Sequence, residues 1–368
     1  FWDRLSTIPL IRSALEELDR RNRARPAFSP PPPPTGSAQN LARFARHGGP
    51  DLCDLRGYPA PVVRDHQTAS AMSSSSRSRA TKSTDPTTVT TKSGTTKSRK
   101  SSTYNPGFDQ HLIDHGIHTT WNSQEIDLDT VYTILAKPRP SLSPSQISDD
   151  TFKIFCKTNA QAKDEDDVCK YVLPTITGPR EDNYPSTANM AFGNLAPLTD
   201  GTIVAAKPDI ALGALPEQLN PTIRSELQHH IIPSTSTDRL IAPNFFLEAK
   251  GPDGSAAVMM RQARYDGAVG ARAMHSLQNY GREEPVYDGH AYTYSSTYHN
   301  SQLQLFAHHA TAPATSEGQP EYHMNKIRGF DMTDTQETFI QGATAYRNAR
   351  DLAKQHRDTF IQDANARY

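Results

Sequence analysis

The sequence predicts a mixed α/β (α+β) domain, a central mixed sheet flanked by helices, preceded by a disordered N-terminal arm. Short segments with the alternating pattern of strands recur within residues 190–330, and long segments with helical periodicity lie between and after them. Residues 69–103 consist mainly of Ser, Thr, Lys and Arg. Because such a segment has almost nothing apolar to bury, we expect it to be disordered.

The composition limits the class of protein. Of the 368 residues 35% are hydrophobic, and the formal net charge is −1, so any nucleic-acid contact must come from local patches. Three cysteines without a CxxC pair, Cys53, Cys156 and Cys169, argue against a disulfide framework and suit a reducing compartment. No apolar run approaches the ~18–20 residues that span a bilayer. We therefore expect a nuclear or cytoplasmic protein without membrane contact, and the Phe1 start leaves open whether the chain is a fragment.

The N-terminal arm contains two distinct parts. Residues 1–68 carry one short helix within residues 1–25 and are otherwise irregular. Pro30–Pro34 form a stiff polyproline stretch, which serves either as a spacer or as a ligand for an aromatic groove on a protein partner. In the linker 69–103, the basic run Lys97–Lys100 is open to three interpretations: a nuclear-import signal, a phosphate-binding tail or a solvated linker.

Three histidines stand out in the lead-in segment 104–148. His111, His115 and His118 are spaced four and three residues apart, which would suit metal ligands on one helix. However, Gly116 interrupts them and no glutamate completes a zinc-protease pattern. We therefore expect structural roles for all three.

The ordered domain is expected over residues 149–368. Its first helix runs from about Asp150 to Leu173, capped by Ser148 or Asp149. The second half of this helix places one carboxylate on an apolar face made by Glu165, Val168, Cys169 and Val172.

The later elements alternate between strands and helices. We expect strands at Met190–Leu195, Pro208–Leu212, Asn244–Lys250, Ala291–His299, Gln302–His309 and Tyr322–Phe330. We expect helices at Glu217–His230, as an insertion, at Ser255–Tyr280, and after a capping box of Thr333 and Gln336. The last helix has an apolar face of Phe339, Ala343, Tyr346, Ala353, Phe360 and Ala364. Close helix contact explains Gly267 and Gly270, and isolated structural roles explain His229-His230 and His308-His309.

The strand Asn244–Lys250 carries the first half of a candidate site. Its side chains alternate between two faces, Phe245, Leu247 and Ala249 on one and Phe246, Glu248 and Lys250 on the other. Both faces begin apolar, which is typical of a central strand covered on both sides. Burying Glu248 and Lys250 there is costly unless they are paired or hold an ion.

Asp209, in Lys207–Leu212, supplies the second half. If its strand neighbours the strand of Glu248, the two carboxylates and the carbonyl of Ala249 form an oxygen site for Mg²⁺, with Mn²⁺ as an alternative. Such an ion polarises a phosphoryl oxygen and lowers the pKa of a bound water. Lys250 would orient that water and stabilise the developing charge, and Glu165 would supply a third carboxylate.

At these residues the sequence resembles the PD-(D/E)XK superfamily of restriction-endonuclease-like nucleases. Pro208-Asp209 and Glu248-Ala249-Lys250 match its signature, Glu165 matches the helical glutamate often found upstream, and Gln262 matches a glutamine in the following helix. The resemblance implies a restriction-endonuclease-like core, catalytic roles for these residues, and a metal held by Asp209, Glu248 and Ala249.

More narrowly, the chain is similar to a family of uncharacterised fungal proteins with a nuclease-like domain. This similarity covers roughly Asp149–Tyr368 and includes Ile231–Ser234, Phe246–Gly254, Tyr265–Ala268 and Phe339–Ala343.

Two functions remain open from the sequence. The first is a Mg²⁺-dependent nuclease that hydrolyses phosphodiester bonds in DNA or RNA. The second is a catalytically inactive protein that keeps the nuclease fold as a nucleic-acid- or protein-interaction module. An enzyme of small molecules is disfavoured, because no P-loop or GxSxG motif is present.

Overall fold

The computed structural model describes residues 16, 20, 100–179, 183–236, 239–315 and 318–368. Contacts divide the chain into two units, 1–91 and 92–368, and all described residues except Glu16 and Arg20 belong to the second. The polyproline stretch, the rest of the helix expected within 1–25 and the linker up to residue 99 lie outside the described residues. The last residues assigned to the linker are described, and Ser101 forms a parallel bridge with Ile203.

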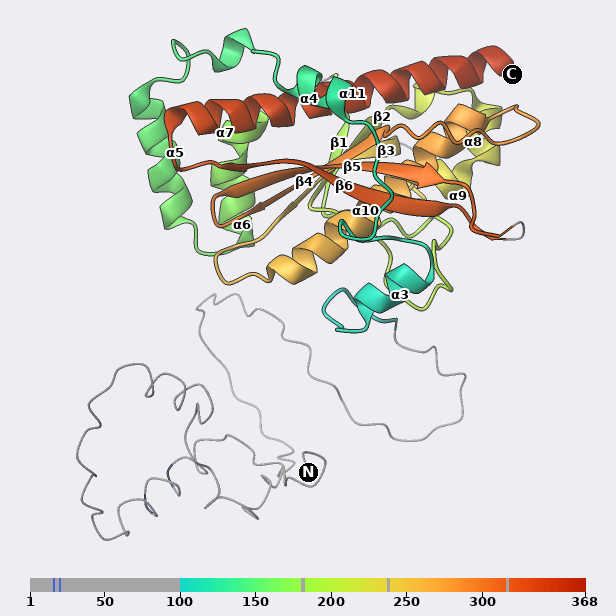
Figure 1. The fold of residues 1–368 in the computed structure, drawn as a ribbon, viewed down its shortest axis with the longest axis horizontal. Helices are drawn as coiled ribbons and strands as arrows, with labels where there is room; N and C mark the ends of the chain where they lie inside the picture. The colour runs from blue at the N-terminus through green and yellow to red at the C-terminus, as the bar shows by residue number, and fades with distance from the viewer. Residues whose placement is uncertain (1–15, 17–19, 21–99, 180–182, 237–238, 316–317) are drawn as a thin grey trace, which may run out of the picture. The chain divides into compact units, whose positions relative to one another are not determined.

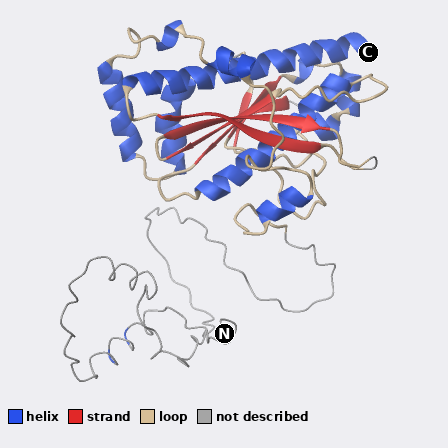
Figure 2. Ribbon diagram, viewed as in Figure 1, coloured by secondary structure: helices blue, strands red, loops and turns tan. Residues whose placement is uncertain are grey.

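A six-stranded mixed sheet forms the centre of the second unit (Figures 1 and 2). Its strands are β1 (Ser186–Ala188), β2 (Ile210–Ala214), β3 (Ile241–Ala249), β4 (Thr293–His299), β5 (Gln302–Thr311) and β6 (Glu321–Asp331). They lie side by side in chain order. Strands β3 and β4 are parallel, and every other neighbouring pair is antiparallel. The predicted fold class, a mixed sheet flanked by helices, is therefore confirmed.

Helices cover both faces of this sheet. In the described part of the chain they are α3 (Phe108–Asp114), α4 (Asp129–Leu135), the 3-10 helix η3 (Pro140–Leu142), α5 (Asp149–Gln161), α6 (Glu165–Asp167), the π-helix η4 (Val168–Val172), α7 (Leu173–Thr177), the 3-10 helix η5 (Pro216–Gln218), α8 (Pro221–Glu226), α9 (Gln228–Ile231), α10 (Ala256–Asn279) and α11 (Gln336–Arg367). Figure 1 shows α11 along one face of the sheet and α10 along the other. No helix among the described residues is long and apolar enough to cross a membrane.

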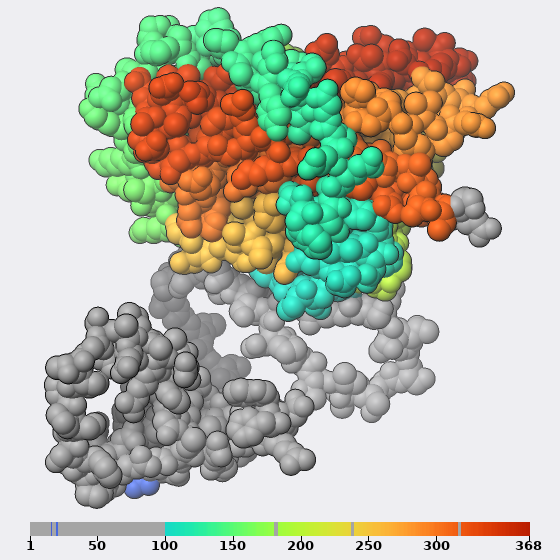
Figure 3. All heavy atoms as spheres, in the orientation of Figure 1, coloured from blue at the N-terminus to red at the C-terminus, as the bar shows by residue number. Residues whose placement is uncertain are grey.

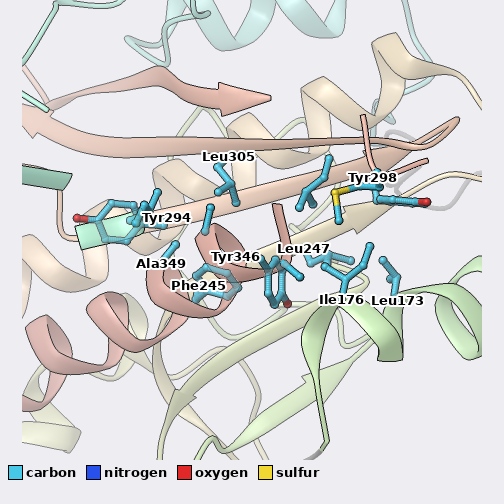
Figure 4. Close-up of a cluster of buried hydrophobic side chains, with 14 of the residues drawn as sticks. Leu173, Ile176, Phe245, Leu247, Tyr294, Tyr298, Leu305, Tyr346 and Ala349 are labelled. Atoms are coloured by element: carbon cyan, nitrogen blue, oxygen red, sulfur yellow. The ribbon is translucent and has the colours of Figure 1, made fainter. Parts of the chain in front are cut away.

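The core has two layers, one on each face of β3. Phe245 and Leu247 contact α11 and α7 through a cluster that includes Tyr346 and Ile176, shown in Figure 4. On the opposite face, Phe246 belongs to a second cluster with residues of α10 and α3. All nine residues of β3 are buried. The alternation predicted for a doubly covered central strand is therefore confirmed.

Helix α10 approaches the sheet closely at its glycines. A Cβ atom on Gly267 would lie 2.1 Å from the ring of His308, and one on Gly270 would lie 2.6 Å from Phe246. The His308 ring is itself held by a 2.7 Å hydrogen bond with Ser295. The glycines thus allow close contact between helix and sheet, as the sequence predicted.

The lead-in segment runs along strand β6. Ile117 forms a parallel bridge with Tyr322, and the Ser123 hydroxyl accepts the N–H of Met324 at 2.8 Å. Figure 3 shows this blue-green segment crossing the front of the second unit. It therefore covers part of what would otherwise be an open sheet edge.

Four predicted elements differ from the structure. The helix expected over Asp150–Leu173 is interrupted: α5 ends at Gln161, and Asp164 starts α6 by accepting the N–H of Asp167 at 2.8 Å. The predicted Ser148 cap is confirmed, since its hydroxyl accepts the N–H of Thr151. The insertion expected at Glu217–His230 is helical but divided into η5, α8 and α9.

The strand expected at Met190–Leu195 is wrong. The N–H of Phe192 donates to the carbonyl of Ala206, and its side chain is buried in the cluster beneath α10. The apolar side chains of this segment therefore fill the core although the segment is not a strand of the sheet. The short strand β1 lies just before, at Ser186–Ala188. The positive φ of 54° at Asn189 then turns the chain away from the sheet.

The last helix starts two residues later than predicted. Asp331 accepts hydrogen bonds from both the N–H and the hydroxyl of Thr333, so Thr333 closes a turn instead of capping the helix. The capping box is formed by Thr335 and Thr338. The predicted apolar face is confirmed, since all six of its residues are buried.

Candidate metal and phosphodiester site

The antiparallel pairing of β2 and β3 brings Asp209 and Glu248 together. Ile210 is the register partner of Leu247, so the start of β2 lies beside the end of β3. The Asp209 N–H donates to Oε1 of Glu248 at 3.2 Å, and the Ala249 N–H donates to Oδ2 of Asp209 at 2.8 Å. The predicted convergence of the two acids is therefore confirmed. The ligand role expected for the Ala249 carbonyl stays a prediction.

Lys250 and Glu165 complete one side of this group. The Lys250 ammonium lies 2.8 Å from Oε2 of Glu165 and 3.9 Å from Oδ2 of Asp209. A Cβ on Gly251 would lie 2.6 Å from the backbone of Asp164. A glycine is therefore required there for the start of α6 to approach the end of β3, and this approach brings Glu165 to Lys250.

Helix α10 adds two residues from above the charged face of β3. Gln262 and Asp266 are one turn apart and both line the same pocket as Asp209. Asp266 is only 1% exposed, and after burial its charge is the largest cause that raises the pKa of Glu248. The sequence argument included Gln262 but missed Asp266. The available signal was a carboxylate four residues after Gln262 and directly before the closely packed Gly267.

The six side chains of Asp209, Glu248, Lys250, Glu165, Gln262 and Asp266 are called the Asp209 site below. Burial raises the pKa of Asp209 to about 6 and that of Asp266 to about 7. Burial, followed by the charges of Asp266 and Asp209, raises the pKa of Glu248 well above its usual value. Such a cluster of perturbed carboxyls in a pocket is typical of a functional site.

Lys250 behaves in the opposite way. Burial alone would lower the pKa of its ammonium, but the hydrogen bond to Glu165 and the charges of Asp209, Glu165 and Glu248 together raise it. Lys250 therefore stays charged and supplies positive charge beside the acids. Burial, followed by the charges of Asp209 and Glu165, raises the pKa of the neighbouring Cys169 thiol to about 12, so that thiol is not a nucleophile at neutral pH.

Three oxygen atoms of the Asp209 site have no hydrogen-bond donor: Oε2 of Glu248, Oδ2 of Asp266 and Oε1 of Gln262. A proton on Glu248 or Asp266 lets one carboxyl bond to the other. When both are ionised they only accept, and the two oxygens remain without a partner. Leaving a buried acceptor unsatisfied costs about 1–3 kcal/mol. A hard divalent cation, which prefers oxygen ligands, fits these groups.

The Asp209 site opens into a pocket of about 410 Å³. Asp209, Glu165, Lys250, Gln262 and Asp266 line this pocket, and Lys207 lines it as a second cation. Glu248 is fully buried behind them. A charged substrate can therefore reach Lys250 and the Asp209 carboxylate from solvent.

The three predicted histidines separate into two groups. His111 and His115 lie with Asp200, while His118 lies with Glu321 and His323, and the potential ligand atoms in each group are within 4.8 Å of one another. The carboxylates of the Asp209 site do not meet that spacing in the described residues. The helix α3 ends at Asp114 and Gly116 takes a φ of +71°, which is why His118 leaves its neighbours.

Comparison with known proteins gives a family and no function. The family described as "Domain of unknown function (DUF7924)" matches residues 151–364, which is more than half of the chain. No curated protein and no solved structure matches the chain. The matched region contains every residue of the Asp209 site.

Proposed function

Because the chain belongs to the DUF7924 family, whose function is unknown, we propose from its site alone that it is a Mg²⁺-dependent nuclease of the PD-(D/E)XK type. The observation that carries the proposal is the convergence of Asp209, Glu248 and Asp266 beside Lys250, with buried carboxyl oxygens that lack donors when the acids are ionised. If these positions served only the stability of the core, apolar residues would be expected there.

The acids of the site would hold the ion. Asp209 and Asp266 line the pocket and Glu248 lies behind them, so their carboxylates would bind Mg²⁺, or Mn²⁺ in its place. When bound, the ion polarises a phosphoryl oxygen and lowers the pKa of a water. Its positive charge also favours the ionised form of all three acids, so binding releases the protons that their raised pKa values retain.

Lys250 would act on the reacting phosphate. Its ammonium is held by Glu165 at 2.8 Å, so it is oriented before a substrate arrives and can donate to charge that develops on a phosphoryl oxygen. Lys207 lines the same pocket and would contact a neighbouring phosphate. Gln262, also on this pocket, would donate to the substrate through its amide nitrogen.

Nucleic acid, DNA or RNA, is the proposed substrate. The argument is chemical: a pocket with two lysines around an acidic centre matches a polyanion that is cut with the help of a cation. A nuclear or cytoplasmic location, and a protein partner for the Pro- and Ser-rich arm, are part of the same proposal. The residues on which they depend, Pro30–Pro34 and nearly all of Lys97–Lys100, lie outside the described residues.

One observation favours a second candidate, an inactive interaction module. Lys250 already pairs with Glu165 and approaches Asp209. The carboxylate oxygens of the site also do not form a group in which all ligand atoms lie within 4.8 Å of one another. In that case Lys250 neutralises the acids in place of an ion. The fold would then be retained for binding alone.

The test is a cleavage assay with the full chain. Labelled single-stranded DNA, double-stranded DNA and RNA are incubated with Mg²⁺, Mn²⁺ or EDTA, using the wild-type protein and the Asp209→Asn and Glu248→Gln variants. We expect cation-dependent cleavage that both variants reduce by about 10³-fold or more, since a catalytic metal contributes several kcal/mol.

Asp253→Asn is the matched control, because Asp253 follows the same strand but is exposed. It should cleave like the wild type. If folded wild-type protein cuts none of the three substrates with either cation, the nuclease proposal is rejected and the interaction module is favoured.

A further inference from the structure

A second group of ligand-type side chains lies outside the Asp209 site. His111 comes from α3, His115 follows its last turn, and Asp200 comes from a loop 85 residues later in the chain. Their potential ligand atoms are within 4.8 Å of one another. Two histidines four residues apart face the same side of a helical turn, which is a common arrangement for binding a transition metal.

The hydrogen bonds of His115 prepare its ring for an ion. Nδ1 of His115 lies 2.7 Å from the carbonyl oxygen of His111, and a carbonyl only accepts, so Nδ1 carries the proton. In the neutral ring Nε2 is then left with its lone pair. Metal-binding histidines in proteins are oriented in this way, by a bond from the other ring nitrogen to a backbone carbonyl.

The carboxylate of Asp200 is held in place independently. Its Oδ1 accepts the N–H of Thr202 at 3.0 Å and the Thr202 hydroxyl at 2.6 Å. These hydrogen bonds lower the pKa of Asp200, with a smaller contribution from the two histidines. The side chain is therefore ionised at neutral pH and fixed in position although it is half exposed.

The remaining ligand atom, Nε2 of His111, lacks a hydrogen-bond partner. It is buried, and it lies 3.3 Å from Oδ1 of Asp200 without the geometry of a hydrogen bond. Two ligands at about 2.0–2.1 Å from a tetrahedral zinc ion are themselves about 3.3 Å apart. The separation of these two atoms is therefore that of two ligands on one ion.

We propose that His111, His115 and Asp200 bind a divalent transition-metal ion of the zinc class. The ion joins α3 to the loop that contains Asp200 and leaves one coordination position open. His115 and Asp200 both line a pocket of about 760 Å³, so the ion can enter from solvent and a further ligand can reach it. Three protein ligands with one open position is the pattern of a reactive zinc site.

The other compact group, His118 with Glu321 and His323, is less suited to an ion. Both ring nitrogens of His323 already have partners, the Gln124 N–H at 3.0 Å and the Thr311 hydroxyl at 2.9 Å. The rings of His118 and His323 are stacked, with an interplanar angle of 8°. Because a metal lies in the plane of each imidazole that binds it, two stacked parallel rings cannot share one ion.

The experiment measures Co²⁺ and Zn²⁺ binding to the full chain. Co²⁺ is titrated while its visible absorption is recorded, and Zn²⁺ is then added in competition. We expect one tetrahedral Co²⁺ per chain, displaced by Zn²⁺. Loss of an outer-shell partner typically weakens metal binding by about 10–100-fold. We expect a larger loss of Co²⁺ and Zn²⁺ affinity from each of the three ligand variants, His111→Ala, His115→Ala and Asp200→Asn.

Thr202→Val serves as a variant that keeps all three ligands. It removes the hydroxyl that holds Asp200, and it should weaken Zn²⁺ binding by about 10–100-fold. His118→Ala is the matched control and should bind Co²⁺ as the wild type does. Metal-free melting curves establish whether each variant is folded. If a ligand variant does not fold, Thr202→Val still tests the proposal.

The result is independent of the Asp209 site. Asp209→Asn and Glu248→Gln should leave the Co²⁺ spectrum unchanged, even if the protein cuts no nucleic acid. The proposal is overturned if wild-type protein shows no tetrahedral Co²⁺ signal, if the three ligand variants bind like the wild type, or if His118→Ala removes the signal.

Discussion

The two faces of strand β3 use the same backbone for different purposes. Toward α11, Phe245, Leu247 and Ala249 are apolar and at most 1% exposed. Toward α10, the strand begins with Phe246 but continues with Glu248, which is fully buried beside other acids. One face stabilises the fold by burying apolar area. The other gives up such stabilisation to hold charges in a fixed position, and substitutions on the two faces should therefore separate stability from metal binding.

The largest expected effect is on the apolar face. Leu247→Ala removes a fully buried side chain and should lower the free energy of unfolding by about 2–5 kcal/mol. Urea unfolding in EDTA measures this. Leu215→Ala, at a side chain that is 40% exposed, should change it by less than about 0.5 kcal/mol. Loss of metal binding by the folded Leu247→Ala protein would show that the two faces are not separable.

On the charged face, Lys250→Met should act on the reaction and not on the ion. Loss of the ammonium should slow cleavage by about 10²–10³-fold, while Mg²⁺ binding is retained because Lys250 is not a ligand. Single-turnover rates at saturating Mg²⁺ measure the effect. Lys163→Met changes an exposed lysine near α6 and should be neutral. Unchanged cleavage by Lys250→Met would contradict the role given to this ammonium.

A substitution in α10 should disturb the contact between this helix and the sheet. Gly267→Ala places a Cβ 2.1 Å from the His308 ring, which Ser295 holds in place. Overpacking of this kind costs about 1–3 kcal/mol, measured as a lower melting temperature. Gly193→Ala is the control, because its Cβ would meet nothing within 4 Å. A neutral Gly267→Ala would mean that α10 can move away from the sheet.

The most gradual expected effect is on the pH dependence of stability in EDTA. Burial raises the pKa of Asp266 to about 7, so the folded state binds a proton that the unfolded state releases near pH 4. Its contribution to stability is present below about pH 4 and is lost as the pH rises toward 7, on the order of 1 kcal/mol for each unit crossed. Asp266→Asn removes this dependence.

The difference in melting temperature between Asp266→Asn and the wild type separates the titration of Asp266 from that of the buried histidines. His308 and His323 have lowered pKa values because of burial, and they destabilise the fold in acid in both proteins. Melting temperatures of the two proteins should therefore approach each other near pH 4, and the variant should be the more stable at pH 8. A constant difference from pH 4 to pH 8 would contradict the raised pKa.

Much of this arrangement could be predicted from local sequence. The alternation in Asn244–Lys250 indicated a central strand with charges at one end, and Lys207–Leu212 indicated a second strand, whose pairing with the first was expected from the resemblance to the PD-(D/E)XK superfamily. Both predictions depend on periodicity and register, which a strand fixes locally. Asp266 could not be found in this way, because its position depends on how α10 crosses the sheet.

The errors have a common physical origin. In each case a side chain takes a tertiary or turn contact in place of the local pattern. Asp164 caps a new helix and interrupts the helical periodicity, Asp331 takes Thr333 away from the expected cap, and Phe192 enters the core from a loop. The metal site proposed at His111 also depends on a remote contact, since Asp200 comes from a loop that no local pattern pairs with the histidines.

Direct measurement of cation binding tests the central claim, that the acids beside Lys250 hold a divalent metal. The His111→Ala variant is used as the reference, so that the histidine group does not contribute. Mn²⁺ binding is followed by electron paramagnetic resonance, with Mg²⁺ as competitor. Binding to His111→Ala is compared with binding to the double variant that also carries Glu248→Gln. The account predicts one Mn²⁺ that Mg²⁺ displaces and that Glu248→Gln abolishes, while the melting temperature in EDTA is unchanged or higher. Equal Mn²⁺ binding with and without Glu248→Gln, in folded protein, would contradict it.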